Sequence, residues 1–282
     1  MKMTKYLLAS TILLGASVLG GAQALAEEGT LPAERETEAQ VKFIEDDSQT
    51  DPVDPTDPDT DDPTDPVDPT DPDDPVDPGT SGPLSLDFAS VLDFGEQKIS
   101  TKTETYYAAP QYFRGEDGQA DLTNPKPLYA QVTDKRGAQK GWTLSVKQNG
   151  QFVSNTNKTP LTGAEITFTS GEAVSNSDAT LGTVQKEFSL SPDGTGAAEN
   201  VVAAAQGEGF GTWVYRFGES AEGDYQAVSL NVPGSTVKEK DTYTTSLTWT
   251  LNDVPTNDDG SDEGNPDEPG EGDTGVSSEL SE

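Results

Sequence analysis

The last apolar run of the chain, residues 243–251, follows a strict two-residue alternation. At the period of a β-strand, hydroxyl side chains occupy one face of this segment, and larger, mostly apolar side chains occupy the other. The second face consists of Tyr243, Thr245, Leu247, Trp249 and Leu251. The pattern therefore predicts a strand with one face buried in a core.

The same alternating pattern occurs earlier in the chain. The tripeptide that ends the run, Trp249-Thr250-Leu251, has a copy in Trp142-Thr143-Leu144, and the residues around this copy again alternate apolar and polar side chains. Two of the three tryptophans belong to these copies, one early and one at the end of the apolar region. A fold that pairs the two copies would close on itself.

Further strand-like runs fill residues 79–255, and clusters of Gly, Asn, Asp and Pro separate them. The runs are 84–94, 104–108, 128–133, 142–146, 164–168, 183–190, 199–205, 212–217, 227–232 and 243–251. A helical period is conceivable only at residues 197–205, where we nevertheless predict a strand or loop. Short strands at this spacing predict an all-β domain, an antiparallel β-sandwich of the Ig-like or Greek-key type.

Residues 1–26 have the organisation of a secretory signal peptide. Two lysines precede an uncharged apolar run at residues 6–19, and Ala24-Leu25-Ala26 supplies the small residues of a cleavage site. A membrane anchor is the alternative, but the run is shorter than the roughly 20 residues that span a bilayer. Cleavage would leave a secreted chain without membrane insertion, beginning at Glu27. Because neither a lipid-attachment cysteine nor a Leu-Pro-x-Thr-Gly sorting signal follows, attachment to a cell would be non-covalent.

Three acidic segments flank the predicted domain, in a chain whose formal net charge is -34. Residues 27–50 are predicted to be a mobile arm, although its apolar cluster of Val41, Phe43 and Ile44 also suits a strand added to a partner. Residues 51–78 repeat Asp-Pro at a three-residue period without a basic residue. This repeat predicts a stiff, disordered linker that reaches about 90 Å. Residues 256–282 are predicted to be a disordered tail.

The amino-acid composition excludes several classes of function. The chain has no cysteine and no histidine, which excludes disulfides, thiolate chemistry, Cys/His metal sites and the usual general base at neutral pH. We therefore expect no cofactor and no enzymatic activity. The large negative charge argues against nucleic acid, because binding phosphates requires clustered Lys and Arg. Carboxylates of the Asp-Pro repeat could bind calcium, but no Asp-x-Asp-x-Asp-Gly loop with a trailing glutamate is present.

Two roles remain open for the tryptophans. A large aromatic followed two residues later by Leu or Tyr is typical of the inward face of a sandwich, and Trp213, Tyr215 and Phe217 share such a face. Alternatively, exposed indoles would form a flat platform that stacks on a sugar ring, while nearby polar side chains bind its hydroxyls. The candidates for these polar groups are Gln148, Asn149, Gln151, Asn252 and Asp253.

Several segments, taken in order along the chain, match the sequence pattern of a known domain family. They are residues 83–88, 92–95, 132–137 leading into 141–146, 161–164, 211–213, 228–234 and 247–251. In these segments the chain resembles, over residues 82–255, the WxL cell-wall-binding domain of Gram-positive surface proteins. The Asp-Pro linker after a signal peptide is also similar to the small, single-domain members of that family.

The resemblance implies a protein of the cell surface that attaches non-covalently to the wall, with peptidoglycan or another wall polymer as its receptor. It implies that both motifs are needed, so the expected binding residues are Trp142, Leu144, Trp249 and Leu251. Trp213 and Tyr215 are additional aromatic candidates. Family domains commonly stop soon after the last motif, whereas this chain continues as an acidic tail.

Two other functions stay open at this stage. The chain could be a structural subunit of a multi-protein surface complex that binds other WxL proteins or a membrane-anchored protein. It could also be a glycan hydrolase, which would need two carboxylates near a sugar. Asp134 and Asp253 are the candidates for these carboxylates, but nothing in their spacing singles them out.

Overall fold

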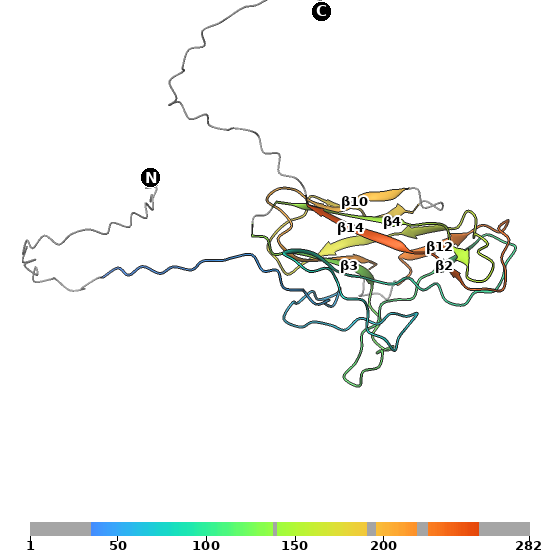
Figure 1. Ribbon diagram of the computed structural model, residues 1–282, viewed down its shortest axis with the longest axis horizontal. Helices are drawn as coiled ribbons and strands as arrows, with labels where there is room; N and C mark the ends of the chain where they lie inside the picture. Colours follow the sequence, from blue (N-terminus) through green and yellow to red (C-terminus); the bar gives the residue numbers. More distant parts are fainter. Residues whose placement is uncertain (1–34, 138–139, 191–195, 219–224, 254–282) are drawn as a thin grey trace, which may run out of the picture. The chain divides into compact units, whose positions relative to one another are not determined.

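The computed structural model describes residues 35–137, 140–190, 196–218 and 225–253 (Figure 1). The predicted signal peptide and the predicted tail lie outside these residues. Residues 35–43 belong to a different unit from the residues that follow, and they are exposed and without regular secondary structure. No helix in the described residues is long and apolar enough to cross a membrane.

The strands form three larger sheets and one small one. The β3 sheet has the order β1 (Leu84–Ala89), β3 (Leu128–Asp134), β11 (Gly211–Phe217), β7 (Gly171–Val174). The β4 sheet has the order β14 (Leu247–Asp253), β4 (Trp142–Gln148), β10 (Ala197–Ala204), β8 (Thr183–Val184). The β12 sheet has the order β2 (Glu104–Tyr107), β12 (Val228–Val232), β6 (Glu165–Phe168), β9 (Phe188–Ser189). The small sheet pairs β13 (Tyr243–Thr244) with β5 (Val153–Ser154).

Every pair of neighbouring strands in the described residues is antiparallel. Since these residues contain no helix, the predicted all-β, antiparallel class is confirmed. The prediction of strand or loop at residues 197–205 is confirmed as well, because β10 occupies this segment.

The inward faces of the three larger sheets share one core. Leu144 of β4, Phe168 of β6 and Val132 of β3 are each at most 2% exposed. Phe168 stacks on Phe188 with ring centroids 4.6 Å apart and meets Phe217 at 4.8 Å. Burying one side chain of this size contributes about 1.5–3 kcal/mol. In Figure 1 the labelled strands β10, β4 and β14 lie together on one side of the ribbon, with β3 on the other side of this core.

The two Trp-Thr-Leu tripeptides lie on neighbouring strands. The antiparallel register places Leu251 of β14 opposite Leu144 of β4, and Asp253 opposite Trp142. β14 is the edge strand of this sheet. The fold thus pairs the two copies, and the pairing joins the end of the described chain to its middle.

The Asp-Pro repeat differs from its sequence expectation. Residues 51–78, called the Asp-Pro strap below, do not form a free linker but fold as a series of turns against the outer face of the β3 sheet. Val53, which is 1% exposed, enters a small apolar cluster with Phe88, Tyr129 and Val214. As a result every residue of β3 is buried, because the core covers one face of the strand and the strap covers the other.

Contacts with residues far away in the sequence explain why the strap folds. The Gln131 side chain forms hydrogen bonds with the strap backbone like those that a neighbouring strand would form. Its Oε1 accepts a hydrogen bond from Val53 N (2.8 Å), and its Nε2 donates to Asp51 O (2.9 Å). Lys126 pairs with Asp54 at 2.6 Å. Burial opposes ionisation of Asp54, but hydrogen bonds from Lys126 and Thr56 outweigh it and lower the pKa of this carboxyl. Cations of the domain thus offset the repulsion between aspartates on which the linker prediction rested.

Candidate functional site

Trp142 is a core residue. Its side chain is 1% exposed, and its Nε1 donates a hydrogen bond to Gly209 O at 3.0 Å. Gly209 has a φ of 78°, and a Cβ atom there would lie 2.5 Å from the indole nitrogen, so only glycine fits. Leu144 is equally buried and belongs to the same core. Neither side chain reaches a ligand at the surface.

The second tripeptide is more accessible than the first. Trp249 and Leu251 are half-buried, because they face the core from an edge strand. The Trp249 ring meets Phe168 edge to face, with centroids 6.4 Å apart. Of the three tryptophans, Trp249 is therefore the most exposed to solvent.

The additional aromatic candidates, Trp213 and Tyr215, lie on β11, which belongs to the β3 sheet and not to the β4 sheet. Trp213 is 8% exposed, and its Nε1 donates to Phe210 O at 3.2 Å. Tyr215 is 3% exposed, and its hydroxyl donates to Gln185 O at 2.6 Å. Burial raises the pKa of the Tyr215 hydroxyl well above its usual range. The aromatic candidates thus enter the core from two sheets, and the structure does not bring them together as an exposed platform.

The polar candidates are also divided. Gln148 is fully buried, and both Gln148 and Gln151 donate their amide hydrogens to backbone carbonyls. Asn149 is exposed, but its Nδ2 donates to the Thr248 hydroxyl at 2.9 Å. Asn252 is exposed and makes no side-chain hydrogen bond within the described part of the chain.

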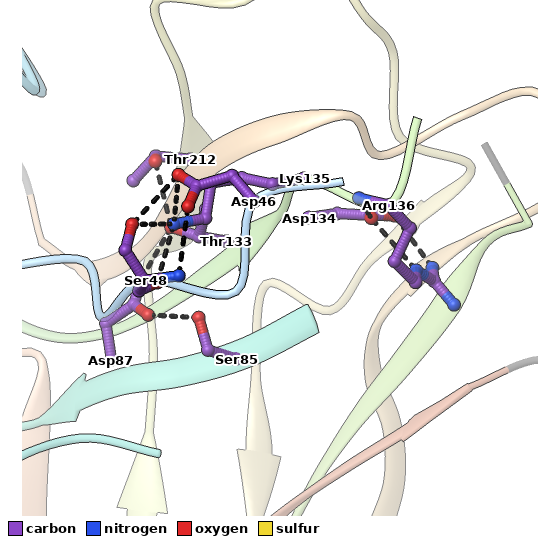
Figure 2. Close-up of polar contacts among 9 residues, drawn as sticks. All are labelled: Asp46, Ser48, Ser85, Asp87, Thr133, Asp134, Lys135, Arg136 and Thr212. Atoms are coloured by element: carbon purple, nitrogen blue, oxygen red, sulfur yellow. Dashed lines mark hydrogen bonds and ion pairs between the residues drawn. The ribbon is translucent and has the colours of Figure 1, made fainter. Parts of the chain in front are cut away.

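A buried arginine connects the strands that carry the tripeptides. Arg136 binds Asp134, at the end of β3, through Nε (2.9 Å) and Nη2 (2.7 Å) (Figure 2). The same guanidinium donates to Gly141 O (2.8 Å), just before β4, and to Asp253 Oδ1 (2.5 Å), at the end of β14. Asp134 and Asp253, the two carboxylates that a hydrolase would have needed, are thus both ion-pair partners of one side chain. This role of Arg136 was not predicted from the sequence.

A second polar cluster lies between β1 and β3 (Figure 2). Asp87 is 2% exposed and accepts hydrogen bonds from Ser85 Oγ (2.6 Å), Thr133 Oγ1 (2.6 Å) and Gln131 Nε2 (3.0 Å). Burial outweighs these hydrogen bonds and raises the pKa of Asp87 to about 6. The Thr133 hydroxyl also shares a hydrogen bond of 2.8 Å with Thr212 of β11. The cluster therefore ties β1, β3 and β11 together beneath the strap.

Lys135, which directly follows β3, binds the segment just before the strap. Its Nζ binds Asp46 Oδ2 at 3.1 Å and Ser48 O at 2.7 Å (Figure 2). Hydrogen bonds from the Ser48 backbone and hydroxyl, followed by Lys135, lower the pKa of Asp46 to about 2. These contacts fix the chain just before the strap.

The outward face of the β4 sheet presents several polar groups, of which the sequence analysis had named only Asn252 as a candidate. The register places Thr250 opposite Ser145 and Asn252 opposite Thr143. None of these side chains has a hydrogen-bond or ion-pair partner in the residues that the structure describes. The threonine in the middle of both tripeptides could have identified this face, because the two-residue alternation of a strand places it on the other side from the Trp and the Leu.

No three acidic side chains of the described residues lie close enough together to hold a metal ion. In a comparison with protein families, residues 30–255 match the model described as WxL domain surface cell wall-binding. No curated protein and no solved structure matches the chain. The matched region covers the Asp-Pro strap, all the strands and both tripeptides.

Proposed function

The chain belongs to the family of WxL-domain surface cell wall-binding proteins, and on this premise we propose that it is secreted and attaches non-covalently to the Gram-positive cell wall through peptidoglycan. The observation that carries the proposal is the pairing of the two family tripeptides in adjacent strands of one sheet. A wall-binding module of this kind needs no cofactor and no catalytic group.

The positions of the tripeptides support a division of labour. Trp142 and Leu144 hold β4 in the core, so we expect them to act on wall binding through the shape of the sheet. Trp249 and Leu251 are half-buried at the sheet edge, where they anchor β14 against the same core. Both motifs are then necessary for binding, because either strand alone leaves the sheet incomplete.

Sedimentation with purified peptidoglycan tests the proposal. The mature protein should pellet with peptidoglycan from which other wall polymers have been removed, and it should stay in solution without it. Trp249→Ala should reduce the bound fraction more than Trp249→Phe, since phenylalanine keeps most of the apolar contact with Phe168. A folded wild-type protein that remains in the supernatant would refute wall attachment through peptidoglycan.

A second candidate function is membership of a multi-protein surface complex with other WxL proteins or a membrane-anchored protein. The observation that favours it is the exposure of Val41, Phe43 and Ile44, at 73%, 87% and 81%. Three apolar side chains so close together in an exposed segment are suited to adding a strand to another protein.

Cross-linking on intact cells tests this second function. A photoreactive side chain in place of Phe43 should give one recurrent protein adduct, and the same group at the exposed position Leu122 should not. The absence of any recurrent adduct at residue 43 would refute the complex.

A further inference from the structure

We propose that the outward, hydroxyl-bearing face of the β4 sheet is the surface that contacts the glycan strands of the wall. The inference rests on the proposed function, and it assigns the contact to the side of the sheet opposite to the tryptophans. It concerns the residues between the Trp and the Leu of each motif, together with their neighbours across the sheet.

The strand register defines this face row by row. In the first row Asn252 of β14 lies opposite Thr143 of β4, which lies opposite Ala203 of β10, which lies opposite Thr183 of β8. The second row contains Thr250 and Ser145. These residues are exposed or half-exposed, whereas their sequence neighbours on β4 are buried.

The third row extends the face toward the other end of β4. It contains Thr248 of β14, Lys147 of β4 and Ala197 of β10. Neighbouring strands lie about 4.8 Å apart, and every second residue of a strand is roughly 6.6 Å further along. On β14 and β4 the face is therefore a regular grid of mostly short side chains. On β10, Ala203 and Ala197 leave room for a flat ligand beside the first and third rows, and the register of this strand shifts between them.

The hydrogen-bonding groups of the central part of this grid are unused. In the described residues the side chains of Thr143, Ser145, Thr250 and Asn252 bind no other protein group. Thr248 differs, because its hydroxyl is bonded to the Asn149 amide. Hydroxyls donate one hydrogen bond and accept two, and an amide offers both donors and acceptors. Such groups match the hydroxyls and acetamido groups of a polysaccharide, which also donate and accept.

Charge restricts the ligand further. The chain has a formal net charge of -34, yet none of the side chains that β14 and β4 place on this face is acidic, and Lys147 is the only charged one on these two strands. An anionic polymer would be repelled by the acidic remainder of the protein. An uncharged glycan strand meets no such barrier at this face.

The proposal also explains the form of the motif. Alternation places Trp and Leu on one side of a strand and the residue between them on the other. The buried Trp142 and Leu144 therefore fix the position from which Thr143 faces outward, and Trp249 with Leu251 does the same for Thr250. Two copies on adjacent strands produce a grid, which a single copy cannot.

A four-residue variant tests the face. Thr143→Val, Ser145→Ala, Thr250→Val and Asn252→Ala together remove the unused groups but keep the size and strand preference of the threonines. We expect the dissociation constant for peptidoglycan free of other polymers to rise on the order of 10- to 100-fold, because several hydrogen bonds are lost. The matched control is Thr167→Val with Ser189→Ala, an exposed hydroxyl pair on the β12 sheet, which should bind like the wild type.

The outcomes separate the site from the function. If the wild type itself does not bind peptidoglycan, the proposed function fails. If the wild type and the four-residue variant bind equally well, or the control loses as much as the variant, the proposed site fails while wall attachment stands.

Two further measurements guard against indirect effects. Near-ultraviolet circular dichroism of the tryptophans should be the same for the wild type and the variant, and Thr250→Arg, a bulky change at an exposed position, should weaken binding on its own.

Binding should change little between 0.1 and 1 M salt, as expected for an uncharged ligand (about 10 and 3 Å screening lengths). Loss of binding in high salt would contradict the proposal, because it would indicate a charged polymer.

Discussion

Arg136 is shared between Asp134, whose side chain is 2% exposed, and Asp253, whose side chain is 54% exposed. The shared guanidinium joins the end of β3 to the end of β14, so it spans two sheets. The two ion pairs differ in their surroundings, and the difference in exposure determines what each contributes to stability.

Removing the arginine should be costly. Arg136→Met leaves the Asp134 carboxylate buried without a counter-ion, so we expect the free energy of unfolding in urea to fall by about 3–5 kcal/mol. Asp253→Asn affects only the more exposed pair and should cost about 1 kcal/mol or less. Arg136→Lys should not restore the wild-type value, since an ammonium cannot reproduce the two parallel bonds to Asp134. Equal losses for Arg136→Met and Asp253→Asn would contradict this account.

Asp87 should make stability depend on pH. Its pKa in the folded protein is about 6, above its usual value, because it is buried. The contribution of Asp87 to the free energy of unfolding is therefore largest below about pH 4, and it is lost as the pH rises through 6. Relative to Asp87→Asn, the wild type should lose up to about 3 kcal/mol of unfolding free energy between pH 4 and pH 7.

Urea unfolding at several pH values measures the effect of Asp87. Asp121→Asn is the control, because hydrogen bonds from Thr123 lower the pKa of Asp121, and its contribution should be lost as the pH falls. A stability difference between wild type and Asp87→Asn that does not vary with pH would show that the folded pKa is not raised.

The Asp-Pro strap should contribute to stability as part of the domain. Val53→Ala removes apolar area from a side chain that is 1% exposed, so we expect unfolding free energy to fall by about 1–2 kcal/mol. Val41→Ala, at a position that is 73% exposed, should change it by less than about 0.5 kcal/mol. If both variants unfold at the wild-type urea concentration, the strap is a linker after all.

The tryptophans should differ in their accessibility to small quenchers. In proteins that keep one tryptophan, with phenylalanine at the other two positions, acrylamide should quench Trp249 several-fold more strongly than Trp142. The reason is that Trp142 is 1% exposed and hydrogen-bonded to Gly209, whereas Trp249 lies on an edge strand. Quenching of Trp142 as strong as in the urea-unfolded protein would contradict its place in the core.

Most of the strands could be predicted from local patterns. Alternation located β3, β4, β11, β12 and β14, because one face of each strand packs on the core and the local sequence records which one. Two strands, β5 (Val153–Ser154) and β7 (Gly171–Val174), were not predicted. Both are short, so they contain too few residues for a period of two to be recognised.

The roles of the tryptophans and of the polar groups depended on tertiary structure. The sequence showed that the tripeptide occurs twice and that threonine faces away from Trp and Leu in both copies. It could not show that β14 lies at an edge while β4 lies inside the sheet, which makes Trp249 half-buried and Trp142 buried. Exposure of this kind is set by neighbours that are distant in the chain.

The sequence by itself determined the class of fold, the repetition of the tripeptide and the absence of cysteine and histidine chemistry, because periodicity and composition are local properties. Only the tertiary structure decided that the Asp-Pro strap belongs to the folded domain. Its aspartates and prolines favour an extended chain when considered alone. Gln131 and Lys126, both far away in the sequence, supply the hydrogen bonds and the charge that make the folded arrangement favourable.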